Sequence, residues 1–253
     1  MSARIVAAAF VLVTLPASRL GAQTVRVATW GSYEGVTGSQ NWTTAGAQVT
    51  FAPPQGHAAW VAGELTGRFG ARDGTARVGG VLHPIPRWWI TVEAGTAARP
   101  EFMPKNSWEA DATALVARRA SLGLSYRRWN YVVGPVDFVI PHFALETQSI
   151  AWDLRVFVSR NPSRRTDAAF YVRAAAPLVR RAGWLISAGA GRESYLVGVA
   201  PSQQVRSLQT LTGAAGVRVN AGKGVTIRME VSVVRSRPVL SRRGLTLGAE
   251  RSL

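Results

Sequence analysis

The ten residues Val225-Thr-Ile-Arg-Met-Glu-Val-Ser-Val-Val234 decide the fold class of this chain. Apolar side chains alternate with polar ones along most of the stretch, and the polar side carries both charge signs, Arg228 and Glu230. A period of two residues is that of a β-strand with one apolar face and one polar face. Strands about ten residues long with this pattern are typical of β-barrels that span a membrane.

The same alternation returns elsewhere in the chain. In the segment 150–159, Trp152, Leu154 and Val156 share one side, whereas Asp153 and Arg155 share the other. Similar alternating segments lie at 87–97, 107–118, 183–194 and 211–219. The segment 107–118 is rich in alanine, so a helix is the alternative there.

Glycine, proline, asparagine and aspartate residues separate these segments at turn-forming positions. The sequence therefore predicts a single antiparallel transmembrane β-barrel of about 14 strands, with 12 as the alternative count. The expected strands lie at 24–35, 42–52, 57–69, 75–83, 87–97, 107–118, 121–133, 136–147, 149–160, 167–176, 183–194, 204–219, 224–236 and 239–253.

The first 23 residues have the pattern of a signal peptide. Arg4 gives a positive start, and the apolar core that follows is too short to cross a bilayer as a helix. Pro16 breaks this core, and small residues near Ala22 suit cleavage. We therefore expect residues 1–23 to direct export and residues 24–253 to form one outer-membrane barrel domain.

The chain is strongly basic, with 30 Lys and Arg residues against 14 Asp and Glu residues. A basic balance can indicate nucleic-acid binding, but an exported chain with scattered arginines argues against that partner. The excess positive charge would instead suit anionic lipid headgroups, phosphate-bearing glycolipid or an anionic solute. The expected partners are outer-membrane lipid, lipopolysaccharide and the barrel-insertion machinery; the oligomeric state is open.

Alternation alone does not say which face of each strand meets the solvent. A soluble β-sandwich or a lipocalin-like binder would place the apolar face inside, whereas a membrane barrel places it outside. The strands are longer than is usual in globular proteins. Tryptophans on the apolar side also suit an aromatic girdle, as found at membrane interfaces: Trp88, Trp108, Trp152 and Trp184. These features favour the membrane barrel.

From Trp88 to Leu253 the chain resembles the YaiO-type outer-membrane β-barrel family. Three segments carry the resemblance: Phe102-Met-Pro104 before the Trp108 segment, Leu122 to Val133, and Trp152 to Ser159 followed by Gly189-Ala-Gly-Arg-Glu193. The resemblance implies an outer-membrane barrel without an assigned activity and without catalytic residues. The chain ends in Leu253, whereas such barrels usually end in an aromatic residue that the insertion machinery recognises.

The polar faces of the predicted strands define candidate lumen-lining residues, which carry both charge signs. One interpretation is a solute path with charge selectivity; the other, which we favour, is a lumen filled by ion pairs, since buried charges need partners. The candidates are Glu93, Asp153, Arg155, Arg173, Arg218, Arg228 and Glu230, with Glu109, Asp111 and Glu193 on the same predicted faces.

No pattern of catalytic, cofactor-binding or metal-ligating residues stands out. The absence of cysteine excludes thiolate metal sites and disulfides. His57, His83 and His142 have no metal-ligand spacing and are expected at strand ends or in loops. Because His142 precedes Glu146 and Ser149 closely, an outer-membrane lipid-modifying enzyme is a third alternative, although no Gly-x-Ser-x-Gly motif is present. We expect a protein without catalysis, cofactor or metal.

Overall fold

A computed structural model describes residues 24–53, 56–200, 202, 204–237 and 240–253. Within this part the chain forms fourteen strands. Their bounds are β1 Thr24–Val36, β2 Trp42–Ala52, β3 Ala58–Arg68, β4 Ala71–Leu82, β5 Trp88–Ala97, β6 Asn106–Ala117, β7 Ala120–Tyr131, β8 Gly134–Glu146, β9 Ala151–Arg160, β10 Thr166–Val179, β11 Ala182–Val197, β12 Gln204–Gly222, β13 Val225–Arg237 and β14 Leu240–Ser252. The predicted signal peptide lies outside the described residues.

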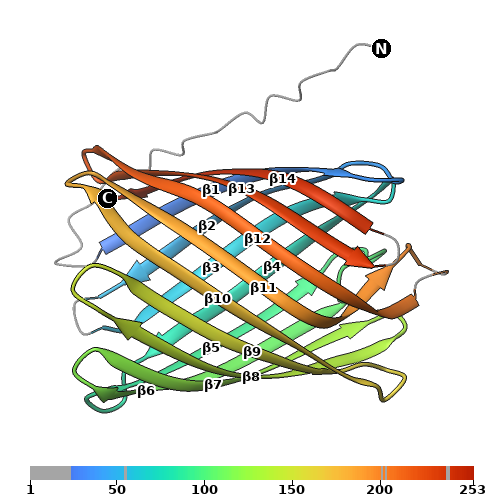
Figure 1. The fold of residues 1–253 in the computed structure, drawn as a ribbon, viewed down its shortest axis with the longest axis horizontal. Helices are drawn as coiled ribbons and strands as arrows, with labels where there is room; N and C mark the ends of the chain where they lie inside the picture. Colours follow the sequence, from blue (N-terminus) through green and yellow to red (C-terminus); the bar gives the residue numbers. More distant parts are fainter. Residues whose placement is uncertain (1–23, 54–55, 201, 203, 238–239) are drawn as a thin grey trace, which may run out of the picture.

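The strands form one closed barrel in which every strand pairs antiparallel with its neighbours in sequence, and β1 closes the ring against β14 (Figure 1). The closing register runs from Arg26 opposite Ser252 to Val36 opposite Arg242. We call the end where β1 begins and β14 ends the terminal end. The opposite end, which carries the long connections 98–105 and 198–203, is the loop end. The predicted all-β, 14-stranded antiparallel barrel is confirmed.

The outer surface of the barrel is apolar across its middle. On β13, Ile227, Met229, Val231 and Val233 are exposed, whereas Ser232 between them is partly buried. Because a barrel has no edge, all its strands pair their backbone groups within the sheet, as a lipid environment requires. The exposed apolar band identifies the outside as the lipid face, and the soluble sandwich alternative is wrong.

The Ala-rich segment 107–118 is strand β6 and not a helix, because its alternating residues pair with both β5 and β7. Tertiary pairing here outweighs the helical preference of alanine. In the described part of the chain, no helix is long and apolar enough to cross a membrane.

The nine tryptophans divide between the two faces. Trp88, Trp108 and Trp152 are exposed on the lipid face, as the girdle prediction requires, and Trp184 follows the same alternation. The other five, which the girdle prediction does not include, point into the barrel: Trp30, Trp42, Trp60, Trp89 and Trp129. Large rings therefore occupy part of the lumen and narrow it.

An arginine introduced on the lipid face should destabilise the barrel more than one introduced on the lumen face. Val231 is 53% exposed on the lipid face, so Val231→Arg should lower the free energy of unfolding by about 2–4 kcal/mol near the bilayer midplane. Ser187→Arg, which adds the same side chain on the lumen side, should cost clearly less. Denaturant unfolding in lipid vesicles measures both values, and equal costs would contradict the assignment of faces.

Candidate functional site

The lumen is the candidate functional site, and the structure places the predicted residues around it. Glu93 on β5 and Glu230 on β13 line its main cavity. Asp153 and Arg155 lie on β9, and Arg173 on β10 is directly opposite Asp153. Arg218 on β12 is directly opposite Arg228 on β13. All seven alternate with the exposed apolar residues of their strands, so they share the inner face.

Two tryptophans in the lumen are held by the same three-strand arrangement. Trp60 on β3 lies over Gly79 on β4, and its indole N–H donates to Oε2 of Glu93 on β5 at 3.0 Å. Trp30 on β1 likewise lies over Gly46 on β2 and donates to Glu64 on β3 at 3.3 Å. A Cβ atom on either glycine would come within 2.4 Å of the ring above it. The bare backbone of the middle strand therefore makes room for the ring.

Most acidic groups on the inner wall have a partner. Arg127 meets Glu109 at 2.7 Å, Arg155 meets Asp153 at 2.8 Å, and Arg77 meets Glu93 at 3.3 Å. Further pairs are Arg242 with Glu34 at 2.8 Å and Arg26 with Glu250 at 4.0 Å. Such pairing offsets the cost of enclosing charges in a narrow lumen.

Three of the predicted arginines lack such partners. Among the described residues, no ion pair of 4.0 Å or less involves Arg173, Arg218 or Arg228. Arg218 and Arg228 face each other across a strand pair, and like charges in that position repel. Both lie towards the terminal end, so two arginines without an ion pair line this mouth of the lumen among the described residues.

The connection 98–105 turns back into the loop end of the barrel. The carboxylate of Asp73, only 1% exposed on β4, accepts backbone N–H bonds from Glu101 at 3.0 Å, Phe102 at 2.9 Å and Met103 at 2.6 Å. Hydrogen bonds to a charged acceptor are worth about 1.5–3 kcal/mol each. The carbonyl of Glu101 in turn accepts the N–H of Ala200, from the connection 198–203, at 2.9 Å. Connections from two separate hairpins therefore meet over this mouth.

Aromatic and guanidinium groups pack beneath this cover. Arg68 and Arg242 both contact the buried ring of Trp42, and their guanidinium carbons are 4.6 Å and 4.8 Å from its centroid. Phe69 packs edge-on against both Trp42 and Phe102. Cation–π and aromatic contacts of this kind give the loop end a packed core.

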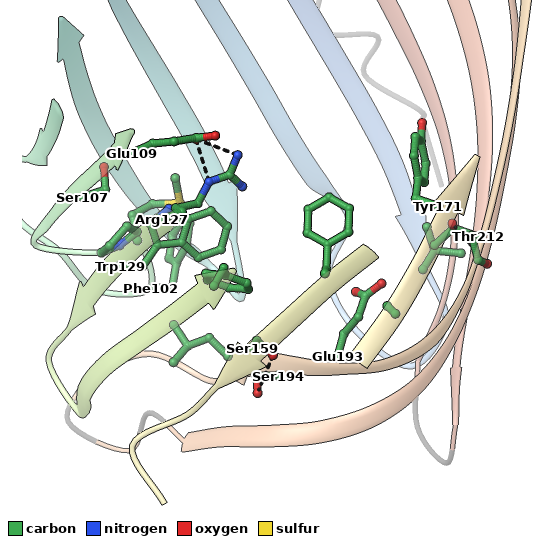
Figure 2. Close-up of a pocket in the computed structure, with 18 of the residues that line it drawn as sticks. Phe102, Ser107, Glu109, Arg127, Trp129, Ser159, Tyr171, Glu193, Ser194 and Thr212 are labelled. Atoms are coloured by element: carbon green, nitrogen blue, oxygen red, sulfur yellow. Dashed lines mark hydrogen bonds and ion pairs between the residues drawn. The ribbon is translucent and has the colours of Figure 1, made fainter. Parts of the chain in front are cut away.

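A cavity of about 720 Å³ remains inside the barrel (Figure 2). Figure 2 shows Arg127 reaching Glu109 on one wall, near Trp129 and Phe102, and Glu193 with Tyr171 on the opposite wall. The lining combines aromatic rings with charged groups. The volume of the cavity is within the range of small-molecule sites, about 300–1,000 Å³. Residues 102 and 103 of the connection therefore narrow the lumen at the loop end, but the lumen is not solid.

His142 differs from its expected position. His57 and His83 lie in connections, but His142 lies inside β8, where its Nε2 is 2.7 Å from Asp111 Oδ2 and its ring covers Gly123. Ser149 lies in the turn after β8, as expected for a turn residue. The described residues contain no group of three His, Cys, Asp or Glu side chains able to hold a metal. His142 therefore belongs to the inner wall and does not face lipid substrates.

Solved structures with the same architecture cover almost the whole chain. A channel described as the CymD monoaromatic hydrocarbon channel aligns over 92% of this chain and 88% of its own, with a TM-score of 0.65 and 8% identity. Omp33, an outer-membrane protein of Acinetobacter baumannii, aligns over 91% and 99%, with a TM-score of 0.57 and 10% identity. A bacterial polysaccharide outer-membrane secretin aligns over 90% and 97%, with a TM-score of 0.57 and 12% identity.

The chain is an outer-membrane-type β-barrel. No protein-family model matches its sequence. No curated protein matches it either. At these identities the likeness concerns the fold. Together with the exposed apolar band, this fold supports the expected location in the outer membrane.

Sequence reasoning missed two parts of the barrel's lumen. Asp73 falls between the predicted strands 57–69 and 75–83, and nothing in its neighbourhood points to residues 101–103. Two of the inward tryptophans could have been found by extending the alternation through residues 24–87, because Trp30 and Trp60 fall on the polar side of their segments. Their glycine and glutamate partners lie on other strands, so only the register identifies them.

The ring-over-glycine arrangement predicts that the cost of a substitution at Gly79 depends on the presence of Trp60. Gly79→Ala should lower the free energy of unfolding by about 1–3 kcal/mol, because the new Cβ displaces Trp60 from Glu93. In a Trp60→Leu background the same change should cost much less. Gly63→Ala is a matched control, since a Cβ there meets no atom closer than 4.0 Å. Denaturant unfolding measures the cycle, and a cost that does not depend on Trp60 would contradict it.

Proposed function

We propose that this protein is a non-catalytic outer-membrane barrel with a narrow lumen covered at its loop end. One observation carries the proposal: Asp73 holds the backbone of residues 101–103 in the mouth, and Glu101 contacts Ala200 from across it. The paired charges on the wall and the inward tryptophans add to the restriction. A general diffusion pore would need a wide polar lumen instead.

The resemblance to YaiO-type barrels agrees with this proposal and remains part of it. That resemblance rests on the order of three segments between Phe102 and Glu193. One of them, Phe102-Met-Pro104, is the part of the connection that Asp73 holds. A barrel of this type would stabilise the membrane or hold a restricted path, with the lumen residues acting by charge and size.

Loss of the Asp73 carboxylate should open the barrel. In planar bilayers we expect small conductance from the unmodified protein and severalfold larger single-channel conductance from Asp73→Ala, because the N–H groups of residues 101–103 lose their acceptor. Asp137→Ala is the control, since Asp137 pairs with Arg128 on the lipid face. A large conductance in the unmodified protein, or none gained in Asp73→Ala, would argue against closure by this connection.

A second candidate is a selective channel for small anionic solutes. The uncompensated Arg173, Arg218 and Arg228 support it, because fixed positive charge in a pore favours anions. The aromatic lining of the cavity, and the fold shared with a protein described as a monoaromatic hydrocarbon channel, agree with a small solute that has an apolar part. In this role the connection 98–105 would have to move for solute to pass.

Charge selectivity tests the second candidate separately. In the Asp73→Ala background, Arg218→Gln with Arg228→Gln should shift the reversal potential in a salt gradient towards cation preference, because the terminal mouth loses two positive charges. Arg235→Gln with Arg237→Gln, both on the lipid face, is the control with the same chemical change. If the reversal potential stays the same in the lumen double variant, these arginines do not line a conducting path.

A further inference from the structure

The outer surface of β13 and β14 carries three arginines at the loop end: Arg235, Arg237 and Arg243. Their immediate neighbours in sequence point inwards. Val234 and Arg242 line the lumen cavity, and the buried Ser236 lies 3.3 Å from the hydroxyl of Thr210 inside the barrel. The alternation of a strand therefore turns the three arginines to the lipid side, where all three are exposed.

The register places Arg235 between the other two arginines and within reach of each. Arg235 is directly opposite Ser241, so Arg243 is its diagonal neighbour, at about 7–8 Å. Arg237 is two residues further along the same strand, at about 7 Å. We call these three residues the outer arginine cluster. Long, flexible side chains with this spacing can converge on one anionic group.

The described strands supply no anion to this cluster. Among the described residues, none of the three arginines forms an ion pair of 4.0 Å or less. The acidic side chain that the described strands turn to the lipid side is Asp137 on β8, which contacts Arg128 and Tyr126. Other strand carboxylates lie on the lumen side, so the repulsion within the cluster has no internal compensation.

The height of the cluster on the barrel indicates what covers it. Val231, Val233 and Leu245, the lipid-facing residues next below, are 53%, 41% and 41% exposed. The arginines therefore follow directly after the apolar band, where hydrocarbon gives way to headgroups. Tyr33, exposed on the lipid face of β1, is diagonal to Arg243, since Gly35 is opposite Arg243. An aromatic ring beside cations at this level suits a sugar-phosphate headgroup.

We propose that the outer arginine cluster binds the phosphate groups of a phosphorylated glycolipid in the leaflet at the loop end. Guanidinium groups bind phosphate oxygens in pairs, which makes arginine suited to this task. The loop end faces outwards in this proposal, because barrels have short periplasmic turns and longer outer loops. The proposal rests on the outer-membrane location within the proposed function, but not on conductance or closure.

The test compares bound glycolipid in matched variants of the full-length barrel. Arg235→Gln/Arg237→Gln/Arg243→Gln should lose, severalfold, the phosphorylated glycolipid that native mass spectrometry detects on the extracted protein. Arg119→Gln/Arg180→Gln/Arg181→Gln makes the same charge change in the terminal-end turns and should keep it. Lysine at the three cluster positions keeps the charge but loses paired hydrogen bonding, so binding should be intermediate. Heat-dependent gel migration establishes that each variant is folded.

The chemical identity of the lipid that the cluster binds is tested on the barrel refolded in detergent. Bis-phosphorylated lipid A should raise the melting temperature of the unmodified protein, and this increase should disappear in the cluster variant. Lipid A without phosphates should have little effect, and so should phosphatidylglycerol. Equal stabilisation by phosphate-free lipid A would overturn the phosphate contact. Equal stabilisation by phosphatidylglycerol would overturn the choice of glycolipid, and equal retention in the two triple variants would overturn the site.

Discussion

Closure of the sheet by β1 against β14 is the constraint on which the rest of this structure depends. In a bilayer the backbone N–H and C=O groups have no water to bind, so a sheet that spans it cannot keep an open edge. The pairing from Arg26–Ser252 to Val36–Arg242 removes the two edges that thirteen hairpin connections would leave. Once the ring is closed, strict alternation assigns each side chain to lipid or to lumen. Side chains inside the barrel then pack against one another, independently of those that face lipid.

On the inside, the barrel must enclose both bulky rings and charges. Glycine on a middle strand lets a tryptophan lie flat and reach a carboxylate two strands away, as in Trp60, Gly79 and Glu93. Arginine–carboxylate pairs stabilise the remaining wall, as in Arg127 with Glu109. The same chemistry holds the connection 98–105 at the loop end, where Asp73 accepts backbone N–H groups from that connection instead of a side chain. These contacts narrow the lumen while a cavity of about 720 Å³ stays within it.

The large positive charge of the chain is divided unequally between the two faces. Carboxylates gather on the lumen side, where they neutralise arginines, whereas the lipid side near the loop end carries Arg235, Arg237 and Arg243 without an acidic neighbour on their strands. An overall charge of +16 therefore describes neither environment well. The local charge balance differs from place to place. Charges are nearly paired in the lumen, whereas arginines are in excess at the terminal mouth and where the barrel meets the headgroups.

The sequence by itself determined the positions of the strands and their two faces, and it favoured fourteen strands while leaving twelve as an alternative. A period of two in Val225–Val234 and its counterparts is a local property, so no knowledge of neighbours is needed to read it. It also placed Glu93, Arg228 and the other charged candidates on the polar faces, and Trp88, Trp108 and Trp152 on the apolar ones. Only the tertiary structure decided which charges meet and which residues hold the connection 98–105 at the loop end. Asp73 is 28 to 30 residues from the amide groups that it binds, and Arg242 is 208 residues from Glu34. Such partners depend on register and closure of the whole ring, which are collective properties that alternation within one strand does not contain.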